Sequence, residues 1–175
     1  MKDLTILGSE EWCVFEDLGI PAIKARVDSG AKTSSIQASN VKIVMRGGHE
    51  WVQFEVHPLQ KNRSITISCE AILIDKRTVR SSSGVSEERL VVKTPLTLGD
   101  TTFDIELTLT NRDNMDFRML LGREALSGRY VVDPGRMLLM GDFSQEDLDK
   151  AYAPYIQKKT GLKIALLASN PNLYS

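Results

Sequence analysis

One short run of residues near the amino terminus carries side chains suited to acid–base chemistry. An alternating strand over residues 22–27 ends on Asp28, and Ser29, Gly30 and Ala31 follow directly. One interpretation is a turn in which the Asp28 carboxylate caps its own backbone, because Asp-Ser-Gly is a common turn sequence. The other is a carboxyl group presented at the end of a strand for catalysis.

Two later segments favour the catalytic interpretation. The run Leu120-Leu121-Gly122-Arg123 joins a short apolar segment to a predicted helical turn. Between the two motifs, residues 77–92 can form a hairpin with a small, flexible tip near Gly84. The chain resembles the retropepsins, the single-domain aspartic proteases. Their parts come in the same order: a strand that leads into Asp-Ser-Gly-Ala, a hairpin, and then Leu-Leu-Gly-Arg.

The chain resembles most closely a bacterial retropepsin-like family that is often labelled ATP-dependent zinc protease and is associated with RimK-type ligases. The matching blocks are residues 26–36, 79–89 and 120–126, and the resemblance covers about residues 5–142. It implies an all-β fold, a retropepsin-like closed barrel, and the activity of an aspartic endopeptidase. Such an enzyme would cleave peptide or protein substrates.

The implied mechanism needs two carboxyl groups that share one proton, because like charges about 3 Å apart cannot both ionise. One carboxyl acts as general base on water and the other donates to the substrate carbonyl. The chain supplies only one Asp-Ser-Gly, with Asp28 as its carboxyl group. An active enzyme is therefore predicted to be a homodimer in which each protomer contributes Asp28.

The resemblance also implies roles for the neighbours of Asp28. Ser29 would hydrogen-bond across the two carboxyl groups, and Gly30 would let backbone approach the substrate. A flap would close over the peptide and exclude water. The predicted supporting residues of the active-site loop are Ser29, Gly30, Ala31, Leu121, Gly122 and Arg123, and the predicted flap and substrate-contact residues are Arg80, Ser81, Ser82, Ser83, Gly84, Glu87, Glu88 and Arg89.

Two departures from the family pattern bear on activity. Lys32 stands close to the motif, where viral retropepsins have acidic residues. A nearby ammonium lowers the pKa of a carboxyl group, which would move activity toward neutral pH or weaken it. Ser29 stands where many members carry threonine, a mild change because the hydroxyl is kept.

The strands that must position these residues are visible as period-two alternation over the first 140 residues. Residues 23–27, 52–56, 65–69 and 103–109 alternate apolar with polar side chains. Turn sequences separate such runs, among them Gly47-Gly48, Gly99-Asp100 and residues 133–135, the last between predicted strands at residues 130–132 and 137–139. Many short strands with frequent turns predict a small barrel or sandwich.

The pattern changes after residue 142. Ser144 is a good N-cap, Asp147 lies in the first turn, and Gly161 can end a helix that Pro154 would kink. Residues 163–168 form a buried-type strand run that, with the following loop, is similar to the start of RimK-type ATP-grasp glutamate ligases. We therefore predict a retropepsin-like domain at 1–142, a helical linker at 143–161 and the first strand of a truncated α/β, ATP-grasp-like domain at 162–175. The alternative is a tail strand that packs on the barrel.

Composition narrows the function classes. The chain has 175 residues, and 22 Lys+Arg against 23 Asp+Glu give a net charge of -1, without the positive excess that nucleic-acid binding usually needs. Cys13 and Cys69 are too few for a disulfide framework and fit a reducing cytoplasm. No export signal and no apolar run long enough to span a membrane is visible, so we predict a cytoplasmic protein without a membrane partner.

We predict no cofactor. His49 and His57 do not form a His-Glu-x-x-His motif, and no Walker-type phosphate loop occurs, so zinc is not expected and ATP would belong only to a missing ligase domain. A second function class stays open: a non-catalytic domain that binds a peptide for a fused or neighbouring ATP-grasp ligase. A third is a peptidase that trims the oligoglutamate product of such a ligase. Dimer geometry discriminates the catalytic from the non-catalytic role.

Overall fold

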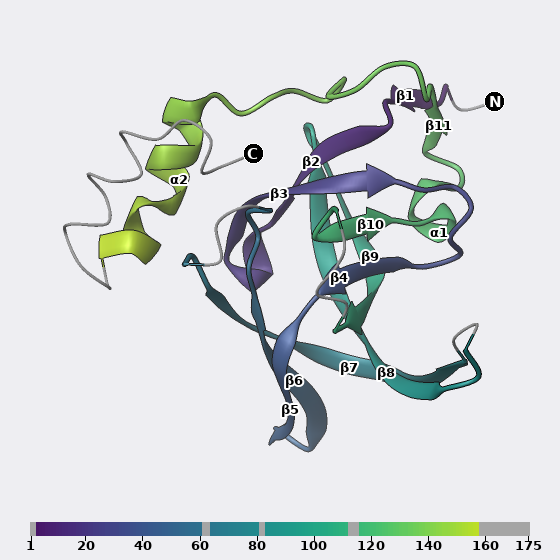
Figure 1. The fold of residues 1–175 in the computed structure, drawn as a ribbon, viewed down its shortest axis with the longest axis vertical. Helices are drawn as coiled ribbons and strands as arrows, with labels where there is room; N and C mark the ends of the chain where they lie inside the picture. Colours follow the sequence, from purple (N-terminus) through teal and green to yellow (C-terminus); the bar gives the residue numbers. More distant parts are fainter. Residues whose placement is uncertain (1–2, 61–63, 81–82, 112–115, 158–175) are drawn as a thin grey trace.

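The computed structural model describes residues 3–60, 64–80, 83–111 and 116–157 (Figure 1). The strands in this part of the chain are β1 (Thr5–Leu7), β2 (Glu10–Phe15), β3 (Ile20–Val27), β4 (Ser34–Gln37), β5 (Ser39–Arg46), β6 (His49–Val56), β7 (Ile67–Arg80), β8 (Ser86–Leu98), β9 (Thr101–Thr110), β10 (Met119–Leu121) and β11 (Tyr130–Val132). The helices are the 3-10 turn η1 (Glu16–Leu18), α1 (Arg123–Leu126) and α2 (Gln145–Gln157).

Six of these strands close on themselves as a barrel. The order is β2-β3-β10-β4-β9-β8, and β8 pairs back onto β2 through Thr97 and Val14. Strands β7, β6 and β5 continue the same sheet from β8 beyond the closed ring. The predicted all-β, retropepsin-like closed barrel is therefore confirmed.

The period-two alternation decides which side chains fill the barrel. On β9, Ile105, Leu107 and Leu109 are buried, whereas Asp104 and Glu106, on either side of Ile105, are exposed. Each fully buried aliphatic side chain of this size contributes about 1.5–3 kcal/mol relative to exposure. A register slip of one residue would turn the whole apolar set to solvent, so this pattern fixes the register of the strand.

Strand β10 brings the two sequence motifs together. It lies between β3 and β4, parallel to β3 with Leu121 opposite Val27, and antiparallel to β4 with Leu120 opposite Ser35. Since β3 ends just before Asp28 and β4 begins at Ser34, the loop of residues 28–33 leaves and re-enters the sheet at the carboxyl end of β10.

The prediction of a strand at residues 137–139 is wrong. Strand β11 does not form a hairpin with that segment; it pairs in parallel with β1, with Ile6 opposite Val131. Residues 137–139 belong to no strand, and Leu138 has a left-handed φ of 56°, which is incompatible with extended pairing.

A buried carboxylate holds this segment in place of a strand partner. Glu11 on β2 is fully buried, and its Oε2 accepts the amide of Gly8 at 2.7 Å and that of Leu139 at 3.1 Å. Its Oε1 accepts the amide of Met140 at 3.0 Å. A charge without solvent is tolerated here because three backbone donors solvate it.

Helix α2 begins where the sequence predicts. The Ser144 hydroxyl accepts the amide of Asp147 at 3.1 Å, and the Asp147 carboxylate accepts the amide of Ser144 at 3.0 Å. Such reciprocal capping satisfies two of the free donors at a helix start. Leu148 and Tyr152 are buried in the barrel core, and the Tyr152 hydroxyl donates to the carbonyl of Ala22, so the helix is packed on β3. The predictions for Gly161 and for residues 162–175 lie outside the described residues.

Candidate active site

The backbone of Asp28 is fixed by β10. Its amide donates to the carbonyl of Leu121 at 2.9 Å, which extends the β3–β10 pairing by one residue. The side chain is half-buried, and Oδ1 accepts the amide of Gly30 at 3.0 Å. Oδ2 has no hydrogen bond to any residue that the structure describes, so this oxygen is free to meet water or a second carboxyl group.

The loop rests directly on the backbone of the Leu-Leu-Gly motif. A Cβ added at Gly122 would lie 2.5 Å from the carbonyl carbon of Thr33 and 2.9 Å from the amide nitrogen of Ser34. Only glycine allows this approach. The amide of Gly122 donates to the buried Ser34 hydroxyl at 3.0 Å, so the motif and the loop also share a hydrogen bond.

The first residues of α1 hold the loop from the same side. The amide of Arg123 donates to the carbonyl of Ala31 at 2.7 Å, and its guanidinium Nη1 donates to the carbonyl of Ser29 at 3.0 Å. The amide of Glu124 donates to the carbonyl of Lys32 at 3.0 Å. The residues predicted to support the loop therefore lie against it, and their part in catalysis stays a prediction.

The charge of Lys32 is directed toward α1. Its ammonium nitrogen lies 3.8 Å from a carboxylate oxygen of Glu124, and both side chains are largely exposed. An exposed pair of this kind contributes at most about 1 kcal/mol to stability.

Strands β7 and β8 form the predicted hairpin. They pair antiparallel out to Arg80 opposite Ser86, and Gly84 at the tip has a left-handed φ of 84°. The tip points to the same side of the molecule as α1 and the loop after β3 (Figure 1). Ser81, Ser82 and the side chain of Arg80 lie outside the described part, so the hairpin is confirmed and its action as a flap stays a prediction.

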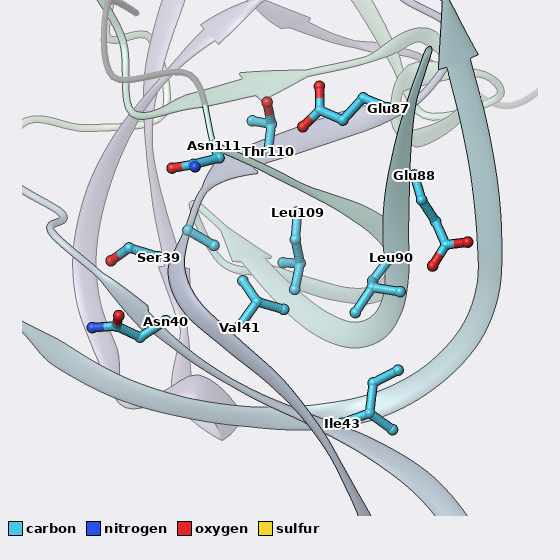
Figure 2. A pocket seen from close by; sticks show the side chains of 11 residues that line it. Ser39, Asn40, Val41, Ile43, Glu87, Glu88, Leu90, Leu109, Thr110 and Asn111 are labelled. Carbon is cyan, nitrogen blue, oxygen red and sulfur yellow. The ribbon is translucent and has the colours of Figure 1, made fainter.

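Glu87 and Glu88, predicted to contact substrate, are not gathered with Asp28. They line a hollow between β5, β8 and the end of β9 (Figure 2), and no residue of the loop 28–33 lines it. Arg89 is mostly buried and its guanidinium Nη2 lies 3.6 Å from the carboxylate of Glu87. The motifs did not identify this hollow. The alternating apolar side chains of β5 could have indicated it, because they are exposed on an edge strand.

His57 and the two cysteines have structural environments. Nδ1 of His57 lies 3.2 Å from the Thr66 hydroxyl, and no cluster of three His, Cys, Asp or Glu side chains that could hold a metal occurs among the described residues. Burial raises the pKa of the Cys69 thiol to about 12. Burial, with a smaller effect of the Glu11 charge, raises that of Cys13 to about 12 as well. Both thiols are therefore protonated at neutral pH, which makes them poor nucleophiles.

No helix within the described residues is both long enough and apolar enough to cross a membrane.

Comparison with known proteins adds three findings. A family model described as RimB-like, retropepsin-like aspartic endopeptidase RimB, matches residues 6–141. Curated relatives from Desulfotalea psychrophila and Shewanella pealeana, each named probable alpha-L-glutamate ligase, are 57% and 52% identical. A crystal structure of a Legionella pneumophila protein of unknown function is 27% identical, covers 79% of this chain and 99% of its own, and superposes with a TM-score of 0.67.

The two glutamate ligases are much longer than this chain. Each alignment covers 97% of the chain but only 36% or 37% of the relative, so the chain spans about a third of the length of the curated relatives it matches.

Proposed function

Because this chain belongs to the RimB-like family of retropepsin-like aspartic endopeptidases, we propose that it hydrolyses peptide bonds with two copies of Asp28, one from each protomer of a homodimer. One Asp28 carboxylate takes a proton from water as the water oxygen attacks the peptide carbonyl carbon. The other, protonated, donates to the carbonyl oxygen. Collapse of the tetrahedral intermediate breaks the C–N bond; the first Asp28 gives the amine the proton that it took from water, and the proton on the former carbonyl oxygen returns to the second Asp28.

The observation that carries this proposal is the setting of Asp28. One carboxylate oxygen is oriented by the amide of Gly30, while the other has no hydrogen bond within the described residues. The loop is held from beneath by Gly122 and Arg123, so a carboxyl group would keep its position as it exchanges a proton. Catalysis of this kind depends on positioning before the reaction begins.

Support for a dimer comes from a small apolar patch formed by Leu4, Ile6 and Val131. These side chains are 43%, 46% and 43% exposed, and Ile6 and Val131 are register partners in the two-stranded sheet of β1 and β11. Within the described residues each of these strands pairs only with the other, so both outer edges of the sheet are free. The sheet lies at the end of the molecule that carries α1 (Figure 1). An exposed apolar patch with free strand edges suits contact with a second copy.

The test compares the purified chain with Asp28→Asn on a peptide library. We expect cleavage by the first and none by the second, while circular dichroism shows the same fold. Equal cleavage by the parent chain and by Asp28→Asn would rule out the mechanism with two Asp28 carboxyl groups. Light scattering with and without a transition-state-mimicking peptide measures whether the active form is a dimer.

A second candidate function is a non-catalytic one: a domain that binds a peptide for a ligase. Its support is that the relatives named probable alpha-L-glutamate ligase match beyond residue 141, where the family model ends. On this view residues 162–175 begin an ATP-grasp-like domain, ATP belongs to that domain, the protein works in the cytoplasm, and the retropepsin-like domain needs no zinc. A chain that stays monomeric with substrate-like peptide and cleaves nothing would favour this function. Release of glutamate from an oligoglutamate tail would instead identify a trimming peptidase.

A further inference from the structure

A hollow of about 690 Å³ separates the start of β5 from the hairpin strand β8 and the end of β9. Its large apolar lining residues are Val41, Ile43, Leu90 and Leu109. Figure 2 shows Val41, Leu90 and Leu109 directed into the same space from three different strands. Val41 and Ile43 are 42% and 38% exposed on an edge strand, a place that proteins usually protect with charge. Covering these apolar side chains with a partner lowers the free energy of the system, because it removes apolar surface from water.

The two strand edges beside the hollow have no partner strand in the described part of the chain. Strand β9 lies between β4 and β8, but it pairs with β4 only as far as Thr110 and with β8 only from Val91. Beyond these points residues 86–90 pair only with β7, and β5 pairs only with β6. The hollow therefore lies between two strand edges, next to the described end of β9. Free amide and carbonyl groups on a strand edge bind an added strand.

The charge of the hollow is wholly negative. Of its lining residues only Glu87 and Glu88 are ionisable. Glu87 is near Arg89, whereas Glu88 forms no ion pair with any residue in the described ranges. An apolar wall with carboxylates at its rim is complementary to lysine or arginine, whose methylene stems pack on apolar surface while their cations reach outward.

We propose that this hollow binds an extended segment of a partner protein, which adds as a strand between β5 and β8. One lysine or arginine of that segment lies along Val41 and Leu90, and its cation meets Glu88, which shares a strand face with Leu90. The site does not depend on Asp28. Because β8 is also a strand of the predicted flap, a bound strand would hold the base of that hairpin in place.

The test measures binding of labelled peptides by fluorescence anisotropy to the Asp28→Asn chain, so that cleavage cannot remove the probe. One peptide alternates valine and threonine around a central lysine, and the other has glutamate at that position. We expect the lysine peptide to bind about tenfold more tightly, since two rim carboxylates attract one charge and repel the other. Methylation of alternate peptide nitrogens on the edge-facing side should abolish binding.

Variants then locate the site. Glu88→Gln should weaken binding of the lysine peptide about threefold, and the double change with Glu87→Gln should remove the preference for lysine. Glu146→Gln, at an exposed carboxylate on α2, is the matched control and should change nothing. Hydrogen exchange should slow in β5 and in residues 86–90 when the lysine peptide is added.

The proposal would be overturned by no binding of the lysine peptide, by equal affinity for both peptides, or by an equal effect of Glu146→Gln and Glu88→Gln. Protection confined to other strands would do the same. Failure of the peptidase assay with binding intact would reject only the proposed catalytic function.

Discussion

At the scale of single residues, Asp28 fits both interpretations of the Asp-Ser-Gly sequence at once. Oδ1 caps the amide of Gly30 as in an ordinary turn, while Oδ2 stays without a hydrogen bond in the described residues. The turn therefore orients the carboxyl group. Turn geometry and a catalytic role are compatible, and only chemistry at Asp28 separates them.

Gly122 lets the loop under Asp28 pack closely because it has no side chain. Gly122→Ala would place Cβ 2.5 Å from backbone of Thr33, so the loop under Asp28 must move. We expect a loss of about 3 kcal/mol in the free energy of unfolding, typical of overpacking against backbone, measured by urea denaturation. Gly135→Ala is the control, because its Cβ would lie 3.4 Å from the nearest atom and its φ is not left-handed. Similar losses in both variants would contradict this account.

The buried thiols make stability depend on pH in the alkaline range. Burial raises the pKa values of Cys13 and Cys69 from 9.0 to about 12, so the folded chain keeps its thiol protons where the unfolded chain loses them. A raised native pKa gives stability that is complete below pH 9 and is lost as pH rises from 9 toward 12. Between pH 8 and pH 10 we expect a loss of about 1 kcal/mol for each thiol.

The measurement is urea denaturation at both pH values, with Cys13→Ala/Cys69→Ala as the reference chain. That chain is less stable at both pH values because of the lost packing, but its change between them should be smaller. An identical change in both chains would show that the two thiols do not cause the pH dependence.

Which residues were predictable depends on how far their partners lie along the chain. Asp28, Gly122 and the tip at Gly84 belong to short motifs, and the sequence predicts their places in a loop or turn. Glu11 was not predictable. It stands beside Glu10 in an ordinary alternating strand, and its role depends on amides of Leu139 and Met140 far along the chain.

At the scale of elements, short sequence motifs predict the structure correctly where the contacts that stabilise it lie between residues close in sequence. The start of α2 depends on Ser144 and Asp147, three residues apart, and the prediction was confirmed. The prediction of a strand at residues 137–139 is wrong because the geometry of this segment depends on the distant Glu11. Apolar residues can be buried in an irregular segment when a side chain supplies its hydrogen bonds.

Glu11→Gln tests whether the Glu11 carboxylate supplies the hydrogen bonds that a strand partner would otherwise give to residues 137–140. The glutamine side chain carries a donor group where backbone amides of Gly8, Leu139 and Met140 need acceptors, so at least one buried N–H loses its partner. We expect the free energy of unfolding to fall by about 2–3 kcal/mol. Hydrogen exchange at Leu139 and Met140 should speed up, measured by NMR.

Glu10→Gln provides the matched control on the neighbouring residue. Glu10 is 3.8 Å from Lys24 and partly exposed, so its loss should cost less than about 1 kcal/mol. If Glu10→Gln were as costly as Glu11→Gln, the three amide contacts would not explain the stability of the segment.

At the scale of the whole molecule, alternation and turns predict a small barrel or sandwich, whereas a closed barrel is implied only by the resemblance to retropepsins. Alternation and turns give the number and faces of many strands, whereas the insertion of β10 between β3 and β4 depends on pairing between distant segments. The hollow beside β5 was hidden for the same reason, because it exists only where β9 ends between two strands that come from elsewhere in the chain.

The apolar patch on β1 and β11 gives a prediction about assembly. Val131→Glu places a charge at its centre beside Ile6, and in a twofold interface each substitution acts twice. We expect the dimer dissociation constant to rise about tenfold or more, measured by sedimentation, with a parallel loss of peptidase activity. Met45→Glu is the control, since Met45 is 62% exposed on β5 and should leave assembly unchanged. An unaffected Val131→Glu dimer would place the interface elsewhere.

Mixing two chains tests whether one active site needs two protomers. Asn at position 28 keeps an oxygen for the amide of Gly30, so Asp28→Asn should assemble like the parent chain. After equal amounts exchange subunits at random, about a quarter of the dimers contain two aspartates, and total activity should fall to about half that of the parent alone. A larger excess of Asp28→Asn should lower the activity further, toward zero, at constant parent concentration. Activity that stayed constant in the mixture would mean that each chain carries a complete site, because a shared carboxyl pair cannot survive the loss of one member.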